Sequence, residues 1–289
     1  MHYMNIQWFP GHMLETQNLL QKSAAKVDAI LEVLDARVPR ASENPLVEKL
    51  CKNKFRLKIL NKADLADPDI TTLWLAYFKN QKKMSAIAIT ATDKALASRV
   101  LTYCGDHLHR NRARKRKLLV VGIPNTGKST LLNTLAGKKI ARTGNVPAIT
   151  RHQQRTSLKN NIDIYDTPGI LWPVITPRQR AYALAVSGAI SDTAVDYQDI
   201  AFFAAGFLLQ RYPELLLSRY RFLDALPGDE TELIERIGAA RGCLKPGGLI
   251  NYQKAGEILI RDLRAGKIGR ISIETPYDEE KNGEKDPFL

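Results

Sequence analysis

The sequence predicts an α/β fold with a mostly parallel sheet covered by helices on both faces, followed by a small all-helical domain. Through the first two-thirds of the chain, short apolar runs alternate with longer segments of helical spacing, as in βαβ units. From about residue 176, apolar residues recur at spacings of three and four, which indicates packed helices. The segment WPVITP at 172–177 interrupts both patterns, so we expect domains at residues 1–175 and 176–289.

The expected strands and helices follow from these patterns. Strands are expected at residues 28–34, 56–60, 86–90, 117–122 and 161–165. Helices are expected between them at 12–26, 43–52, 69–82, 93–108 and 128–136, and in the second domain at 178–190, 198–210, 214–225, 230–240 and 251–265. Ligands of open parallel sheets bind at the carboxyl ends of the strands, so a site is expected there.

Composition and charge limit the functional classes. No stretch approaches the roughly 18 apolar residues of a membrane span, and the N-terminus has no signal or transit pattern. From this we expect a cytoplasmic protein with no membrane partner. The three cysteines lack paired spacing, so we expect reduced thiols. The net charge of +13 favours a polyanionic partner, nucleic acid or ribosome. The basic run at 110–117 either contacts phosphates or forms a solvated face.

The strongest motif is a complete G-x-x-x-x-G-K-S at Gly122–Ser129, between an apolar strand and a helical segment. Its backbone N–H groups can wrap phosphates, Lys128 can neutralise the β- and γ-phosphate oxygens, and Ser129 can coordinate Mg²⁺. The motif predicts nucleotide contacts from Asn125, Thr126, Gly127, Lys128, Ser129 and Thr130.

Two further segments fit the switches of a nucleotide hydrolase. In Asp166-Thr-Pro-Gly169, after the strand at 161–165, the carboxylate can hold Mg²⁺ and the Gly169 N–H can approach the γ-phosphate. Thr150 lies in a polar, proline-containing segment, and its hydroxyl can reach Mg²⁺ when the γ-phosphate is present. The alternative for Thr150 is an exposed loop threonine. Lys128 and Thr150 are therefore candidate catalytic residues.

Guanine selectivity is predicted from Asn61-Lys62-Ala63-Asp64, after the strand at 56–60. The Asp64 carboxylate can accept two parallel N–H bonds from guanine, whereas adenine presents the opposite donor pattern. Lys62 would lay its stem across the base, and Asn61 would tie loops together. The strand-end residues Thr90 and Ala91 fit a loop whose backbone contacts the guanine oxygen.

The order of these motifs is unusual, because the Asn-Lys-x-Asp element precedes the P-loop, whereas ordinary GTPases place it well after. The sequence therefore predicts a circularly permuted GTPase domain, an arrangement tolerated where termini are close and exposed. In this order the Asp-Thr-Pro-Gly switch leads directly into the helical domain. We expect nucleotide state to be transmitted to that domain.

The chain resembles the ribosome biogenesis GTPase A (RbgA/YlqF) family of circularly permuted GTPases. The resemblance is carried by the motifs above and by Gln7–Met13 (QWFPGHM), Asp35–Pro39 (DARVP), Asn44-Pro45, Lys245–Gly248 (KPGG) and Arg261–Arg270 (RDLRAGKIGR). It implies a GTPase that binds the large ribosomal subunit, with its rRNA and ribosomal proteins, late in assembly and is stimulated by that subunit. We also expect a monomer that binds GTP or GDP with Mg²⁺. The chain departs from the family pattern at Ala148, where glycine is usual, and at Asn251, where aspartate is common.

The resemblance also suggests two roles for single residues. Ile170 is apolar where many GTPases carry a water-orienting glutamine, and His12 resembles the family's substitute, which could orient or deprotonate the attacking water. The alternative is an exposed His12 or one that contacts RNA. Asn125 resembles the asparagine that binds K⁺ in potassium-stimulated GTPases, or it only shapes the loop.

In the helical domain, Lys254, Arg261 and Arg264 fall on one face of the helix expected at 251–265, with the apolar residues on another. We expect this basic face to point outward and contact rRNA, ahead of an acidic tail at 274–286. The leading interpretation is a GTP-hydrolysing assembly factor whose nucleotide state controls ribosome binding. A non-catalytic GTP-sensing RNA-binding scaffold is the alternative, and a nucleotide kinase would not need Asn61-Lys62-x-Asp64.

Overall fold

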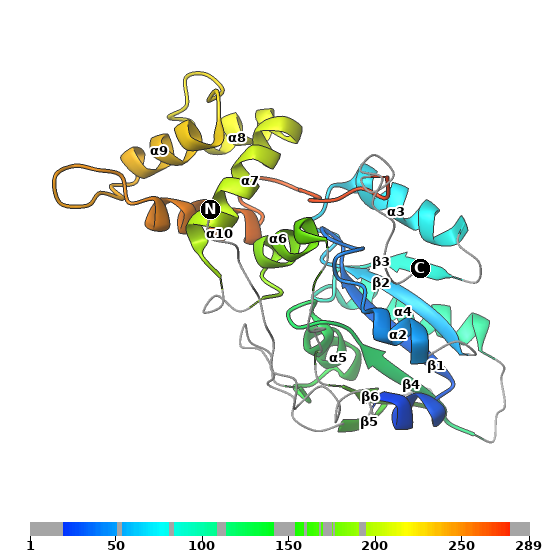
Figure 1. Cartoon of the computed structure of the whole chain (residues 1–289). Coiled ribbons are helices and arrows are strands. Elements are labelled where there is room, and N and C mark those ends of the chain that lie inside the picture. Colours follow the sequence, from blue (N-terminus) through cyan, green and yellow to red (C-terminus); the bar gives the residue numbers. More distant parts are fainter. Residues whose placement is uncertain are drawn as a thin grey trace.

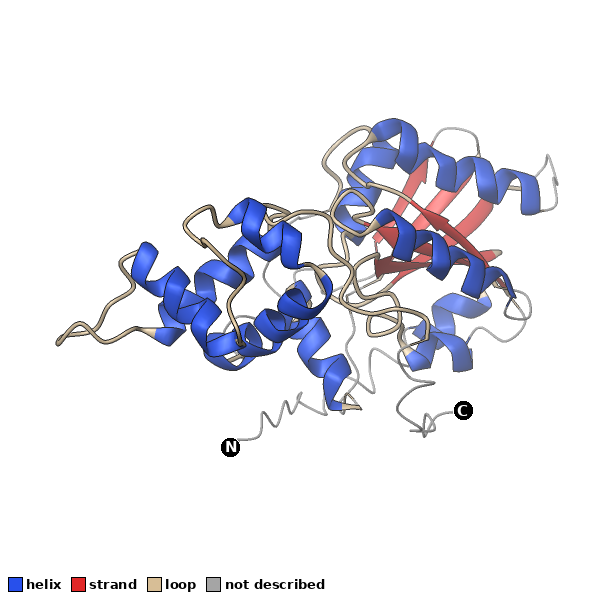
Figure 2. Cartoon of the chain, turned by 90° about the horizontal axis from the view of Figure 1, so that it is seen from above, coloured by secondary structure: helices blue, strands red, loops and turns tan. Residues whose placement is uncertain are grey.

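The computed structural model describes residues 20–50, 54–80, 84–108, 114–141, 154–158, 161–167, 169, 175, 177–190 and 195–277. In these parts a twisted sheet with helices around it lies beside a separate group of helices (Figure 1). Seen from above, helices lie on both sides of the sheet (Figure 2). In Figure 1, α6 lies between the sheet and the remaining helices of the second group.

The sheet has six strands in the order β3-β2-β1-β4-β6-β5. Its strands are β1 (Ala29–Asp35), β2 (Phe55–Asn61), β3 (Ser85–Ala88), β4 (Arg116–Val121), β5 (Gln154–Leu158) and β6 (Ile162–Asp166). All neighbours pair in parallel except β5 and β6, which are antiparallel. The five predicted strands are confirmed, but β5 was missed because QRTSL is an edge strand with no apolar run.

Helices cover both faces of this sheet, as predicted. They are α2 (Pro45–Leu50), α3 (Pro68–Asn80), α4 (Lys94–His107) and α5 (Lys128–Ala136). Successive strand residues point to opposite faces, so Leu31 and Val33 pack in the cluster that includes residues of α4 and α5. Ile30 packs instead with the helical segment at 20–25 and with α2, and Leu34 packs with α3.

The helical group contains α6 (Arg178–Ser187), α7 (Tyr197–Arg211), α8 (Pro213–Arg219), α9 (Glu230–Ala240) and α10 (Tyr252–Arg264). Helices α7 and α10 pack so closely at Gly256 that a Cβ there would lie only 2.7 Å from the Ala201 Cβ. The helix expected at 214–225 ends at Arg219, and this prediction was too long. Tyr220 caps α8 by donating its N–H to the Leu216 carbonyl while its ring is fully buried, which turns the chain inward.

The helical core extends into the loops of the sheet. One apolar cluster joins residues of α6, α7, α9 and α10 to Val38 and Ala41 after β1 and to Ile123 after β4. The division at residues 175 and 176 thus stays a prediction, since the two parts share this cluster. Among the described residues, no single helix is long and apolar enough to cross a membrane; only α7 and α8 together, bent by 111°, meet that length and composition.

Candidate functional site

The P-loop, residues 122–129, lies at the carboxyl end of β4. Its backbone conformation and close contacts require glycine at two positions. Gly122 and Gly127 have φ of +149° and +92°. A Cβ would lie 2.4 Å from the Val33 carbonyl oxygen at Gly122, and 2.2 Å from the Asn61 amide nitrogen at Gly127. Gly127 is also the N-cap of α5 and has no side chain to cap it. The first N–H groups of α5 are therefore left for an anion.

Lys128 begins α5 with its ammonium group inside the loop. Its side chain is buried, and Nζ donates to the Ile123 carbonyl at 2.6 Å. Burial lowers the pKa of Lys128 to about 8, although the nearby Asp166 carboxylate opposes this shift. A buried cation held mainly by one carbonyl fits an anionic ligand, which would restore the charged form.

Asp166 ends β6 and lies near this lysine. Both of its carboxylate oxygens are buried and have no hydrogen-bond partner among the described residues. Burial raises the pKa of Asp166 to about 6, against the effect of the nearby Lys128 ammonium group. Two unsatisfied buried carboxylate oxygens beside a phosphate-type loop fit a divalent cation such as Mg²⁺.

Gly169 brings the Asp-Thr-Pro-Gly segment against the P-loop. A Cβ at this position would lie 2.9 Å from the Pro124 nitrogen and 3.1 Å from Lys128 Nζ. The Thr167 hydroxyl donates to the Val120 carbonyl of β4 at 2.8 Å, which fixes the start of the segment. The predicted switch glycine thus lies where the phosphate end of a nucleotide would bind.

The base loop, residues 61–67, follows β2 and is tied to two other loops by Asn61. The Asn61 amide donates to the Thr126 carbonyl at 2.7 Å, and its oxygen accepts the Ala91 N–H at 2.9 Å. Asp64 is exposed, and its carboxylate accepts the Thr90 hydroxyl at 3.2 Å. These bonds bring the predicted base-binding and phosphate-binding residues to one end of the sheet.

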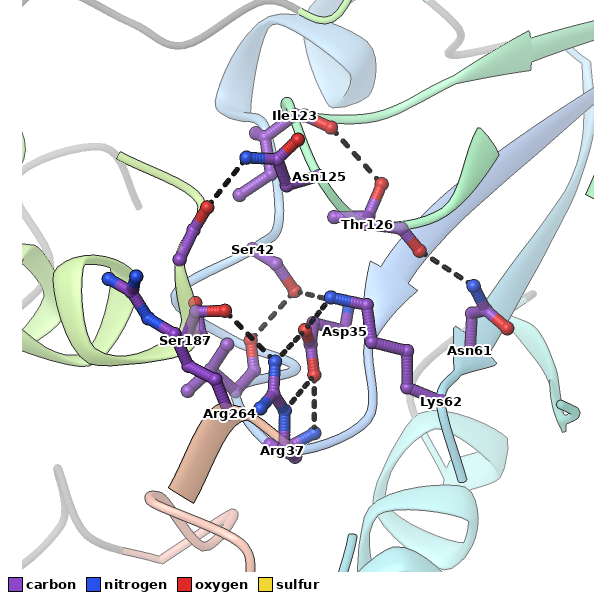
Figure 3. Close-up of polar contacts among 12 residues, drawn as sticks. Asp35, Arg37, Ser42, Asn61, Lys62, Ile123, Asn125, Thr126, Ser187 and Arg264 are labelled. Atoms are coloured by element: carbon purple, nitrogen blue, oxygen red, sulfur yellow. Dashed lines mark hydrogen bonds and ion pairs between the residues drawn. The ribbon is translucent and has the colours of Figure 1, made fainter. Parts of the chain in front are cut away.

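Lys62 belongs to a buried charge network that sequence reasoning did not assign (Figure 3). Lys62 has φ +62°, and its ammonium group donates to Asp35 Oδ2 at 2.8 Å. Asp35 also receives two bonds from the Arg37 guanidinium, at 2.9 and 2.7 Å. Burial alone would raise the pKa of Asp35, but the two cations lower it well below its usual range. The only sequence signal was the opposite charges in Asp35-Ala-Arg37.

The backbone carbonyls at the C-terminal end of α6 accept hydrogen bonds from side chains in three separate parts of the chain. Arg37 donates to the Ser187 carbonyl at 3.0 Å, and the P-loop Asn125 donates to the Gly188 carbonyl at 2.7 Å (Figure 3). Arg264 donates to the Val186 and Ala185 carbonyls at 3.0 and 2.7 Å. The last carbonyls of a helix lack partners within it and attract cations, which explains these contacts.

One prediction about a side chain is wrong as a result. Arg264 was expected on the outward basic face of α10, and this is wrong, because it caps α6 and is only partly exposed. Lys254 and Arg261 are exposed as expected. Asn251, the departure from the family pattern, is the N-cap of α10 and accepts the Lys254 N–H, a role that asparagine and aspartate share.

Several expected site residues lie outside the described residues. These are His12, Thr150 and Ile170, so their predicted roles are neither supported nor opposed by the geometry. Ser129 and Thr130 lie in the first turn of α5, next to Lys128. The Asn125 amide nitrogen donates to the Gly188 carbonyl. Its amide oxygen can still accept a bond or bind a cation, so the K⁺ role stays a prediction.

Comparison with known proteins is consistent with this geometry. Residues 117–202 match the family described as "50S ribosome-binding GTPase". Ribosome biogenesis GTPase A of Priestia megaterium is 41% identical over 288 residues, covering 96% of this chain and 99% of that protein. The protein of the same name from Thermotoga maritima is 31% identical over 273 residues, covering 94% and 95%. The crystal structure of GNP-bound YlqF from T. maritima matches with a TM-score of 0.66 and 28% identity, covering 91% of this chain and 99% of that one.

We predict that Asp166→Asn stabilises the ligand-free protein. Because the folded-state pKa is raised to about 6 from 3.8, the free energy of unfolding falls as pH rises from about 4 to about 6, and the full cost of the charge is present above pH 6. Removing the charge should raise the free energy of unfolding by up to about 3 kcal/mol at pH 7.5, a figure that already includes the attraction of Lys128 for the carboxylate. The gain should vanish below about pH 4, where both states are protonated.

Urea unfolding in EDTA measures this effect, and Asp163→Asn on the same strand is the matched control. The Asp163 pKa is lowered, because bonds from Ser157 and Arg155 outweigh burial, so its replacement should destabilise at neutral pH. Unchanged or reduced stability of Asp166→Asn at pH 7.5 would contradict the assignment of an uncompensated charge.

Proposed function

Because the chain belongs to the ribosome biogenesis GTPase A family, we infer that it binds and hydrolyses GTP and acts in assembly of the large ribosomal subunit. The observation that carries the nucleotide part is the Asn61 side chain, which joins the base loop directly to the P-loop. The carboxylate that we propose to read the base and the P-loop are thereby held at one end of the sheet.

We propose the following roles at the site. Lys128 and the N–H groups of Gly127, Lys128 and Ser129 bind the phosphates, with Thr126 and Thr130 beside them. Asp166, Ser129 and Thr150 would hold Mg²⁺, which supplies positive charge against the phosphates when bound. Gly169 lies against the P-loop and offers its N–H near the γ-phosphate.

Asp64 reads the guanine edge, and Thr90 and Ala91 line the same end.

Two further roles are proposed from the family resemblance. His12 would orient the attacking water, because the residue after Gly169 is the apolar Ile170. The Asn125 oxygen would bind K⁺, and its amide nitrogen is already fixed by the Gly188 carbonyl. The same bond also fits the alternative, in which Asn125 only shapes the loop.

We propose rRNA of the large subunit, with neighbouring ribosomal proteins, as the binding partner. Lys254 and Arg261 are exposed on α10, and Arg261 forms an ion pair with Glu257 on the same helix. The net charge of +13 favours the same class of partner. We further propose that the protein acts as a monomer in the cytoplasm, with the helices α6–α10 forming the ribosome-binding part.

We predict that Asp64→Asn changes base preference. The amide replaces one acceptor oxygen by a donor, so one of two guanine bonds is lost and xanthine gains one. GTP affinity should fall by about tenfold or more, and xanthosine triphosphate should compete better, as measured by displacement of a fluorescent GDP. Asp69→Asn, an exposed aspartate at the start of α3, is the control. Wild-type affinities for both nucleotides in Asp64→Asn would sink this assignment.

We expect GTP turnover to be slow alone and faster with purified large subunits. His12→Ala should lower the stimulated rate by roughly 10²- to 10⁴-fold, the usual range for a group that positions or deprotonates water. Cosedimentation with large subunits must be measured in parallel, because lost docking would mimic lost chemistry. Full stimulated turnover in a docking-competent His12→Ala would rule out this role, and no turnover in either condition would favour the scaffold alternative.

Binding to large subunits should weaken steeply with salt, because each phosphate contact releases counterions. Replacing Lys254 and Arg261 together by glutamine should reduce the slope of log K against log salt by about one to two units. Arg99→Gln on α4 is the control, since Arg99 is exposed and lies outside the helices α6–α10. A slope identical to wild type in the double variant would place the RNA contact elsewhere.

A further inference from the structure

The chain after α10 returns to the base loop. Residues 270–272, which we call the clamp, follow α10 by a short turn and run from the helical group toward the sheet beside α3 (Figure 1). Gly266 in that turn has φ +69°, and a Cβ there would lie 2.7 Å from Leu65 Cδ2. The turn is therefore packed directly against the loop that carries Asp64.

Arg270 makes the principal contacts of the clamp. Its Nε donates to the Ala66 carbonyl at 2.9 Å, and its Nη2 donates to the Ala63 carbonyl at 2.9 Å. One planar guanidinium thus holds two carbonyls on either side of Asp64 and Leu65. Lysine could not reproduce this arrangement, because an ammonium group lacks the fixed fork of two donors.

The rest of the clamp continues along the same loop. The Ile271 N–H donates to the Leu65 carbonyl at 2.9 Å, and the Ser272 hydroxyl accepts the Asp67 N–H at 3.2 Å. The Tyr212 hydroxyl, at the end of α7, lies between Asp67 and the Ser272 backbone. Four backbone groups of the base loop are consequently satisfied by three consecutive residues of the C-terminal part.

Asp64 itself makes no bond to the clamp in the described structure; its carboxylate accepts only the Thr90 hydroxyl among the hydrogen bonds found. Its position is set by its neighbours, since the carbonyls of Ala63 and Leu65 are both held from the clamp. A carboxylate that must meet two N–H groups of a base in parallel depends on such backbone placement, because small displacements weaken hydrogen bonds steeply.

We propose that Arg270 is a positioning residue for guanine recognition, acting through the backbone of the base loop on Asp64. The proposal rests on the proposed function of Asp64 as the group that reads the base. It also gives the helical part a direct path to the nucleotide, because α10, with its exposed Lys254 and Arg261, ends six residues before Arg270. This route reaches the base loop, whereas the predicted switch segments lie at the phosphate end of the site.

The test compares Arg270→Gln and Arg270→Lys with wild type in the full chain. Arg270 is exposed, so its replacement should leave the unfolding midpoint within about 2 °C of wild type. Affinity for a fluorescent GDP should fall by about tenfold in Arg270→Gln, with a faster release rate, and by less in Arg270→Lys. Affinity for pyrophosphate, which has no base, should stay within twofold. Arg241→Gln, another exposed arginine at the end of α9, is the matched control.

A double variant identifies the route. If Arg270 acts through Asp64, the GDP affinity of Asp64→Asn should fall little further when Arg270→Gln is added. GDP binding by Arg270→Gln within twofold of wild type would overturn the proposal, as would an equal loss of pyrophosphate affinity or full additivity with Asp64→Asn. Wild-type GDP affinity in Asp64→Asn would instead overturn the proposed role of Asp64, so the two failures are distinguishable.

Discussion

The two hydrogen bonds of the Asn61 carboxamide hold together parts of the site that lie far apart along the chain. The amide nitrogen reaches the Thr126 carbonyl of the P-loop, and the amide oxygen holds the Ala91 N–H after β3. Gly127 must be glycine because the same amide lies where its Cβ would be. The Asn61 side chain therefore holds the base loop against the P-loop, whichever order the motifs take in the sequence.

Around that fixed centre, the site contains charges that the protein alone does not satisfy. Lys128 is buried with one carbonyl as its hydrogen-bond acceptor, and Asp166 is buried with no hydrogen bond to either oxygen among the described residues. In the charge network of Asp35, Arg37 and Lys62 each group has a charged partner, and one nitrogen, Arg37 Nη1, is buried without a hydrogen bond among the described residues. The phosphate end is thus prepared to gain stability from ligands, whereas the base end is already held by the protein.

Sequence reasoning predicted the fold and the residues that lie together at one end of the sheet, because both depend on local patterns. Apolar runs gave five strands within two residues, and the motif residues Asn61, Asp64, Lys128, Asp166 and Gly169 lie together as expected. It missed β5, whose polar edge strand has no apolar signal, and it placed Arg264 outward because helical periodicity cannot show that a neighbouring helix ends there. The clamp is likewise a tertiary contact between segments about 200 residues apart, with no pattern in either segment alone.

The strand order has a consequence for how the molecule is made. Strands β3, β2 and β1 are adjacent in the sheet and come first in the chain, so they can pair before β4 and the P-loop have been translated. The base loop at the end of β2, however, receives four of its backbone hydrogen bonds from residues 270–272. The base loop, in the part of the chain that is translated first, therefore gains these bonds only when nearly the whole polypeptide has left the ribosome that synthesises it.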